Sequence, residues 1–162
     1  MDNENYQLLI DKALKFLSFR PRSKYEISRK LQQLASQKNI SLQLVDKVVS
    51  DLELKNLIND KEFINWWREQ RDEFRPKGKK LLKIELRQKG IDGKIVDEVL
   101  NTEGRESHHE FFLAFTIAQK RLSRLSNLSP DDIKNKLTSF LARRGFDWET
   151  INQVIDTIFK KE

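Results

Sequence analysis

The chain has 162 residues, of which 35% are charged, with five Gly, three Pro and no Cys. This composition favours helices and excludes disulfide bonds and zinc sites built on thiolates. The net charge is +6 at pH 7, no apolar run is long enough to span a membrane, and the polar first residues do not resemble a signal peptide, so we expect a cytoplasmic protein.

One short segment recurs three times along the chain, as Asn39-Ile40-Ser41, Gly90-Ile91-Asp92 and Gly145-Phe146-Asp147. Gly, or Asn as second choice, tolerates the left-handed conformation that ends many helices. The Ser or Asp two residues later can cap the helix that follows. A fixed internal period is typical of repeat proteins. We therefore expect an all-α fold of three tandem three-helix repeats, residues 1–54, 55–104 and 105–162, stacked in an elongated array that is straight or curved.

The first repeat contains the clearest helix signals. Apolar residues from Tyr6 to Leu17 recur at helical spacing and predict its first helix. Arg20-Pro21-Arg22 interrupts the pattern, and Ser23 with Glu26 three residues later has the spacing of a capping box, so a second helix should begin there. Its third helix should begin after Ser41.

The second and third repeats follow the same plan. We expect a helix from Asn59 or Asp60 to Phe74, a break at Arg75-Pro76, and two further helices near residues 78–89 and 92–100. In the third repeat, helices should begin near Ser107, at Pro130 and after Asp147. Pro130 stands where proline is favoured, at the first position of a helix.

The positive charge is concentrated in the second repeat. The segment from Arg75 to Lys89 contains a single acid, Glu85, and seven basic residues: Arg75, Lys77, Lys79, Lys80, Lys83, Arg87 and Lys89. On a helical wheel Lys79, Lys80, Lys83 and Arg87 share a sector about 100° wide, which we call the basic ridge. Most charged runs are solvated helix faces, but seven cations with one nearby acid lack the usual partners.

The sequence therefore favours contact with a polyanion, either phosphates or an acidic protein groove. Basic residues at equivalent turns of the other repeats can extend the same surface. They are Arg20, Arg22, Lys24, Arg143 and Arg144.

Other motifs favour structural roles. Trp66 and Trp67 could stack on bases, and at most one of them can face inward with Phe63, but packing in the core or between repeats is the better interpretation. His108-His109-Glu110 lacks a third ligand at helical spacing and indicates a helix start rather than a metal site. No constellation of catalytic residues is present, so we expect no enzyme, no cofactor, no metal and no membrane partner.

Several segments, in this order, resemble the RecX family of recombinase regulators: Ala13-Leu14-Lys15-Phe16-Leu17-Ser18, Arg22-Ser23-Lys24-Tyr25-Glu26-Ile27, Leu57-Ile58-Asn59-Asp60, Lys77-Gly78, Lys89-Gly90-Ile91 and Phe140-Leu141-Ala142-Arg143-Arg144-Gly145-Phe146. The resemblance implies a monomeric, non-catalytic protein that binds the groove of the RecA filament on single-stranded DNA and usually inhibits it. It also implies a helical fold of three three-helix repeats. Two alternatives stay open: a general binder of single- or double-stranded DNA, and a helical scaffold for an acidic protein.

Overall fold

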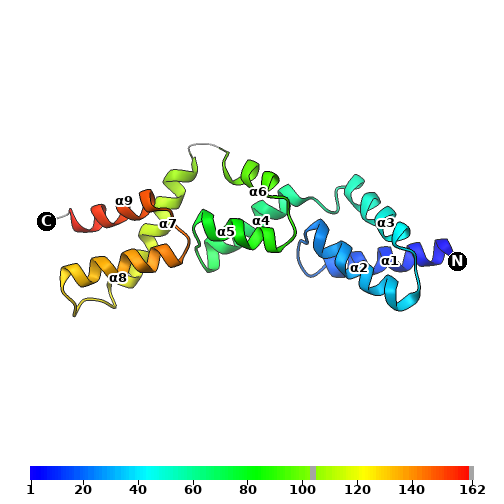
Figure 1. The fold of residues 1–162 in the computed structure, drawn as a ribbon, viewed down its shortest axis with the longest axis horizontal. Coiled ribbons are helices and arrows are strands. Elements are labelled where there is room, and N and C mark those ends of the chain that lie inside the picture. Colours follow the sequence, from blue (N-terminus) through cyan, green and yellow to red (C-terminus); the bar gives the residue numbers. More distant parts are fainter. Residues whose placement is uncertain (103–104, 161–162) are drawn as a thin grey trace. The chain divides into compact units, whose positions relative to one another are not determined.

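The computed structural model describes residues 1–102 and 105–160, with the side chains of all of them except 105 and 106. Within these ranges the chain forms nine helices and no strand (Figure 1). The helices are α1 (Asp2–Leu17), α2 (Lys24–Lys38), α3 (Leu42–Leu54), α4 (Asp60–Phe74), α5 (Lys79–Gln88), α6 (Gly93–Leu100), α7 (Arg105–Leu122), α8 (Pro130–Arg143) and α9 (Trp148–Phe159). The predicted all-α fold of tandem three-helix domains is confirmed.

The three repeated turns have the predicted backbone. Asn39, Gly90 and Gly145 have φ values of 54°, 75° and 87°, in the left-handed region. Each turn ends one helix and sends the chain into the next, so the conformation is set by one residue in each case.

The predicted capping residues also act as predicted. The side chains of Ser41, Asp92 and Asp147 accept hydrogen bonds from the first-turn N–H groups of α3, α6 and α9. Ser23 and Glu26 form the capping box at the start of α2. These bonds satisfy donors that a helix start would otherwise leave without partners.

Small differences from prediction lie at other helix ends. Asn59 rather than Asp60 caps α4, because its Oδ1 accepts from the Glu62 N–H at 3.2 Å. The helix expected to open near Ser107 begins two residues earlier, at Arg105. The repeat boundaries after residues 54 and 104 stay predictions, and Gly104 itself lies outside the described residues.

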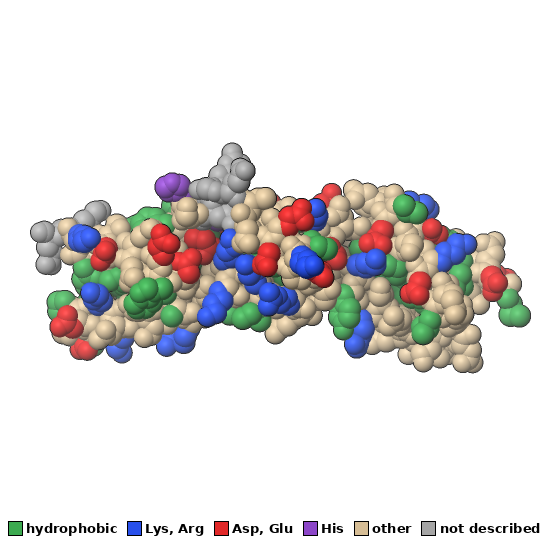
Figure 2. Space-filling view, turned by 45° about the horizontal axis from the view of Figure 1, so that its top comes forward, with side chains coloured by type: hydrophobic (Ala, Val, Ile, Leu, Met, Phe, Trp, Pro, Cys, Tyr) green, Lys and Arg blue, Asp and Glu red, His purple; other side chains and the backbone are tan. Residues whose placement is uncertain are grey.

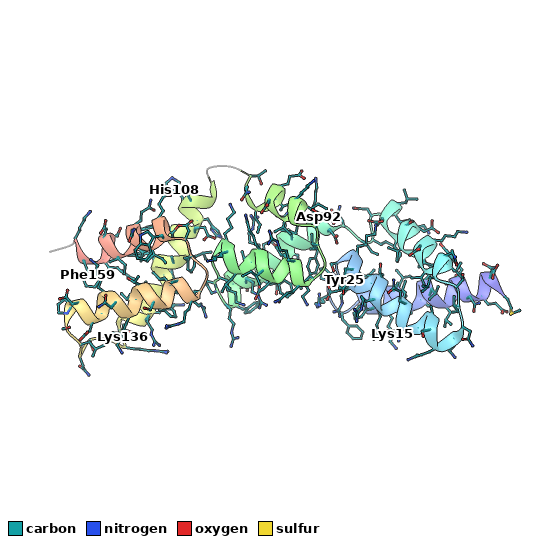
Figure 3. The ribbon with its side chains drawn as sticks, in the orientation of Figure 1. Lys15, Tyr25, Asp92, His108, Lys136 and Phe159 are labelled. Atoms are coloured by element: carbon teal, nitrogen blue, oxygen red, sulfur yellow. The ribbon has the colours of Figure 1, made fainter. Side chains whose placement is uncertain are left out.

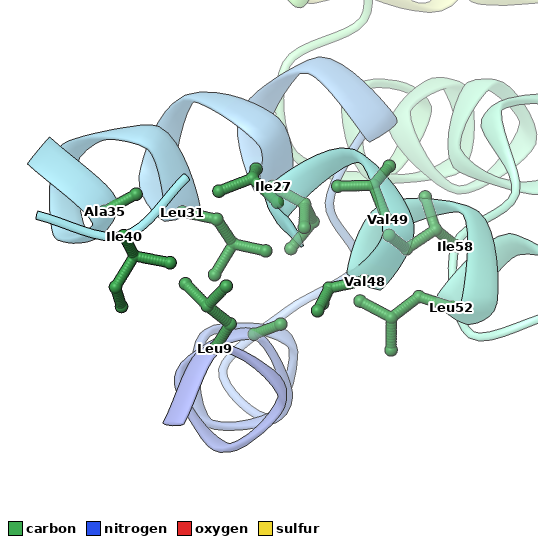
Figure 4. Packing of buried hydrophobic residues seen from close by; sticks show 11 residues of the cluster. Leu9, Ile27, Leu31, Ala35, Ile40, Val48, Val49, Leu52 and Ile58 are labelled. Carbon is green, nitrogen blue, oxygen red and sulfur yellow. The ribbon is translucent and has the colours of Figure 1, made fainter. Parts of the chain in front are cut away.

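The core includes two hydrophobic clusters, one in each of two compact units of the chain. The first joins α1, α2 and α3 around Leu9, Ile27 and Leu31, with Ile58 added from the segment before α4 (Figure 4). The second joins α7, α8 and α9 around Leu137, Leu141 and Ile151. Each cluster uses the apolar faces that the helical periodicity predicts.

The chain divides into two compact units that do not coincide with the repeats. The N-terminal unit contains Met1–Trp66 and Leu86–Val96, and the C-terminal unit contains Trp67–Glu85 and Asp97–Glu162. The middle helices α4, α5 and α6 each contribute residues to both units. Each unit therefore contains a complete three-helix cluster together with part of the second repeat.

Within each unit, one repeated turn packs on the start of a helix, and we call this arrangement a joint. In the N-terminal unit the Ser23 hydroxyl donates to the Lys89 carbonyl at 2.7 Å, and a Cβ added at Gly90 would lie 2.2 Å from Cγ of Tyr25. Tyr25 lies at the beginning of α2 in Figure 3. Glycine is required here both for its positive φ and for this close approach.

The C-terminal unit repeats the arrangement. The Gly78 N–H donates to the Arg144 carbonyl at 2.8 Å, and the Lys80 N–H donates to the Gly145 carbonyl at 3.3 Å. A Cβ added at Gly145 would lie 2.6 Å from Cγ of Leu81. The turn before α9 thus packs on the start of α5, as the turn before α6 packs on the start of α2.

Candidate anion-binding surface

Packing of α5 decides which of its basic side chains reach solvent. Leu82 and Leu86 are 2% and 0% exposed and fix the buried face of the helix. Lys80 and Arg87 are exposed, whereas Lys79 and Lys83 are half-buried. Figure 2 shows Lys and Arg side chains gathered over the stretch where α4 and α5 lie in Figure 1.

In the C-terminal unit, the joint brings two predicted residues beside the ridge. Because the carbonyls of Arg144 and Gly145 accept from N–H groups at the start of α5, the Arg143–Arg144 pair lies next to Lys79 and Lys80. Arg143 is exposed, and the Arg144 guanidinium lies 5.7 Å from the Phe140 ring centroid. Residues more than sixty positions apart in sequence thus share one surface.

Lys77 belongs to an internal network instead. Its ammonium pairs with Glu85, whose other carboxylate oxygen accepts from the Trp67 indole and from Arg71 Nε, both at 2.9 Å. Burial alone raises the pKa of Glu85, but the hydrogen bonds from Lys77, Trp67 and Arg71 lower it below its usual value. The expectation that the seven cations lack partners is therefore wrong for Lys77.

Lys83 and Lys89 also have carboxylate partners, and Lys89 shares its partner with Arg20 and Arg22 in the N-terminal unit. Lys83 Nζ lies 2.7 Å from Asp97 Oδ1. Glu26 Oε1 lies 2.6 Å from Arg20, 3.9 Å from Arg22 and 3.6 Å from Lys89. Asp97 and Glu26, the partners of Lys83 and Lys89, lie outside residues 75–89, so a count of acids within that segment could not include them.

The basic residues around Glu26 change the pKa of its carboxyl group. Burial raises the pKa of Glu26, but the Arg20 hydrogen bond, the Ser23 N–H and the charges of Arg20 and Lys89 together lower it. Lys24, a further predicted contact, pairs with Glu53 at 2.8 Å. The predicted basic residues of the first repeat are thus part of ion pairs that hold its helices.

Four of the predicted cations are exposed and form no ion pair or hydrogen bond through their side chains with any described residue. We call them the open cations: Arg75, Lys80 and Arg143 in the C-terminal unit, and Arg87 in the N-terminal unit. An exposed cation without a carboxylate is available to an external anion at the lowest desolvation cost.

The two tryptophans pack within the fold, as the sequence favours. Trp66 lies 5.8 Å from Phe63 between ring centroids, with the Arg20 guanidinium 5.9 Å from its ring. Trp67 is half-buried and donates to Glu85. Neither indole is an exposed platform for a base.

The His108-His109-Glu110 segment lies in the first turns of α7. His109 Nε2 lies 2.6 Å from Asp72 Oδ2, and Glu110 Oε2 accepts from the Lys79 N–H at 3.3 Å. Within the described residues, no group of three or more His, Asp or Glu side chains can hold a metal ion. No helix of this part of the chain is both long and apolar enough to cross a membrane.

Sequence reasoning missed the role of Glu110. The available signal was Gly78, which stands at the start of α5 where Ser23 and Ser129 cap α2 and α8 with their hydroxyls. A glycine in that place predicts that the cap comes from elsewhere.

Comparison with known proteins identifies the family. Models of the first, second and third three-helix domains of RecX match residues 10–52, 59–100 and 110–155. The "Regulatory protein RecX" of Chlorobaculum tepidum is 31% identical over 162 residues, covering 100% of this chain and 95% of that protein. The protein of the same name from Chlorobium phaeobacteroides (strain BS1) is 34% identical and covers 93% of each chain.

Solved structures agree. The crystal structure of RecX from Lactobacillus salivarius superposes with a TM-score of 0.85 at 26% identity, covering 96% of this chain and 97% of that one. A second crystal structure of a regulatory protein RecX, 21% identical with a TM-score of 0.78, shows the same fold over 96% of this chain and 73% of the other. The resemblance in sequence is thereby confirmed, and the chain belongs to the RecX family of regulatory proteins.

Proposed function

We propose that this protein is a non-enzymatic regulator, in the inhibiting direction, of the RecA recombinase. It binds the groove of the RecA filament on single-stranded DNA as a monomer, and such a partner places it in the cytoplasm. Membership of the RecX family supports a regulatory role. The open cations support an anionic binding partner, because phosphate backbones and acidic grooves attract unpaired positive charge.

The positions of Lys80 and Arg143 are the main observation in support of the proposed binding surface. The joint brings the turn that follows Arg143 to the start of α5, where Lys80 lies, both side chains are exposed, and neither pairs with a described carboxylate. Arg75 and Arg87 add charge in their own units. Lys79 and Arg144 lie at the joint and contribute through the same surface.

The ion-paired residues contribute less to binding in this proposal. Arg20, Arg22, Lys24, Lys77, Lys83 and Lys89 each have a carboxylate within 4 Å. An external anion must compete with that carboxylate, so part of the attraction is already used internally.

The test reverses charge on three open cations, with Lys80→Glu, Arg87→Glu and Arg143→Glu combined in one variant. We expect at least about tenfold weaker inhibition of DNA-stimulated ATP hydrolysis by RecA, because each lost phosphate or carboxylate contact lowers affinity. The matched control reverses Lys38, Lys134 and Lys136, which are exposed on α2 and α8 outside the proposed surface. Equal inhibition by the variant and the control would show that these three cations do not contribute to filament binding.

The open cations would also suit naked DNA, which gives a second candidate function. A titration of DNA across salt concentrations, with and without RecA, separates the two. Tight, steeply salt-dependent binding to naked DNA with no effect on RecA favours a general DNA binder. Failure to co-sediment with either DNA or filament favours an acidic protein partner.

A further inference from the structure

The start of α5 has no capping side chain of its own. Gly78 occupies the position that Ser23 and Ser129 occupy before α2 and α8. A Cβ at Gly78 would lie 2.2 Å from the Gly145 carbonyl oxygen, so any larger residue would open the joint. The N–H groups of this helix start must therefore find acceptors in another segment.

Those acceptors come from the third repeat. The carbonyls of Arg144 and Gly145 accept from the N–H groups of Gly78 and Lys80, at 2.8 Å and 3.3 Å. Glu110 Oε2, from α7, accepts from the Lys79 N–H at 3.3 Å. Glu110, a residue of α7, thus caps α5 from a different repeat.

The surroundings of Glu110 disfavour its charge. Its side chain lines a small cavity with Arg68 from α4, Lys79, Leu82 and Leu100 from α5 and α6, and its own neighbour His109. Burial raises the pKa of Glu110 to about 7, and the carboxylates of Asp147 and Asp72 act in the same direction. The Lys79 N–H and His109 act against them.

Asp72 is itself constrained. Its Oδ2 pairs with His109, while its Oδ1 is buried and accepts no hydrogen bond from a described residue. One oxygen of Asp72 therefore has no described partner, and the negative charge of Asp72 makes a second carboxylate charge at Glu110 less favourable.

We propose that Glu110 acts as a proton-dependent latch, which strengthens the joint at the start of α5 when its side chain is neutral and weakens the joint when it ionises. A neutral carboxyl group still accepts from the Lys79 N–H through its carbonyl oxygen and avoids the cost of a buried charge. This property of the fold is independent of what the basic surface binds. It also governs that surface, because the same joint holds the Arg143–Arg144 turn beside Lys80.

The direction of the pH effect follows from linkage. Because the pKa of Glu110 is higher in the folded protein than its ordinary value of 4.5, the folded state binds more protons near neutrality. Its contribution to stability is complete below about pH 4.5 and is lost as pH rises through about 7.

The test is hydrogen exchange of the Lys79 and Lys80 amides in the full chain and in the Glu110→Gln variant, from pH 5 to pH 9. Glutamine keeps the acceptor but cannot ionise. Relative to the variant, opening of the wild-type joint should increase by up to about tenfold per pH unit from pH 5 to about pH 7 and level off above it. A Glu149→Gln variant, which changes an exposed carboxylate in the first turn of α9, should behave as the wild type.

A direct titration covers the case in which Glu110→Gln does not fold. Carbon NMR of the wild-type Glu110 carboxyl should give a midpoint near 7, and Asp72→Asn should lower it by removing a neighbouring negative charge. A titration midpoint near 4.5 for the wild-type Glu110 carboxyl, or parallel exchange profiles for wild type and Glu110→Gln, would show that ionisation of Glu110 does not control the joint.

Discussion

At the scale of single residues, Glu85 is the best-connected carboxylate of the C-terminal unit. Its two oxygens accept from Lys77, Trp67 and Arg71, and its side chain is 16% exposed. All three donors are themselves partly buried, so each loses hydration that the bond to Glu85 helps to replace. The carboxylate joins α4, the break after it, and α5.

Glu85→Gln should destabilise the protein by about 1–3 kcal/mol, because two charged donors lose their partner while buried. Urea unfolding with wild type and variant at pH 7 measures the difference. Glu149→Gln, at an exposed position, should change stability by less than about 0.5 kcal/mol. Indistinguishable curves for Glu85→Gln and wild type would contradict the role of the network.

A second prediction concerns acid. The pKa of Glu26 is lowered in the folded protein, so its contribution to stability is present above its ordinary value of 4.5 and is lost as pH falls through the lowered value. Wild type should therefore exceed Glu26→Gln in stability at pH 7, and the gap should close below pH 4. A gap that stays constant from pH 7 to pH 3 would mean that the Arg20 and Lys89 pairs contribute nothing.

At the scale of elements, the joints explain why two of the three repeated turns use glycine. Gly90 and Gly145 contact Tyr25 and Leu81 so closely that a Cβ has no room. Asn39 has the same left-handed backbone and already carries a Cβ. Both residues tolerate the left-handed turn, and the close packing excludes asparagine at the two joints.

Gly90→Asn isolates the packing contribution, because asparagine tolerates the positive φ but adds a Cβ 2.2 Å from Tyr25 Cγ. We expect a loss of about 1–3 kcal/mol from overpacking. Asn39→Gly should change stability by less than about 0.5 kcal/mol. Thermal unfolding followed by circular dichroism measures both, and the loss should shrink when Gly90→Asn is combined with Tyr25→Ala. If Asn39→Gly lowered the stability as much as Gly90→Asn does, close packing at the joint would not explain the glycine at position 90.

Sequence patterns that span only a few residues predict most of the helices and turns. The turns at Asn39, Gly90 and Gly145 and the caps at Ser23 and Ser41 depend on residues within four positions of one another. Glu110 and Lys79 are thirty-one positions apart, and Ser23 and Lys89 are sixty-six apart. Such pairs depend on how repeats pack, which the periodicity of one sequence does not specify.

At the scale of the whole molecule, the repeat period predicts the fold but not its division into units. The boundary expected after residue 54 separates Ile58 from the first cluster, in which it is 3% exposed. It also separates Ser23 from Lys89. The charge prediction erred for the same reason, because Asp97 and Glu26 reach Lys83 and Lys89 from outside the basic segment.

A fragment of residues 1–54 should therefore be less stable than a fragment of residues 1–100, which contains the whole N-terminal unit. The shorter fragment loses the burial of Ile58 and the joint at Gly90. Thermal unfolding midpoints compare the two, and residues 1–100 carrying Gly90→Asn should lie between them. Equal midpoints would show that the first three helices are self-sufficient.

The methylene of Asn39 has a practical consequence for protein engineering. A designer who wishes to lengthen this scaffold by grafting another copy onto the first turn would meet a steric stop there. Asn39→Gly would remove it, provided that the grafted helix begins with a residue as small as Gly78 or Ser23. A glycine at the repeated turn is thus one requirement for adding a module there.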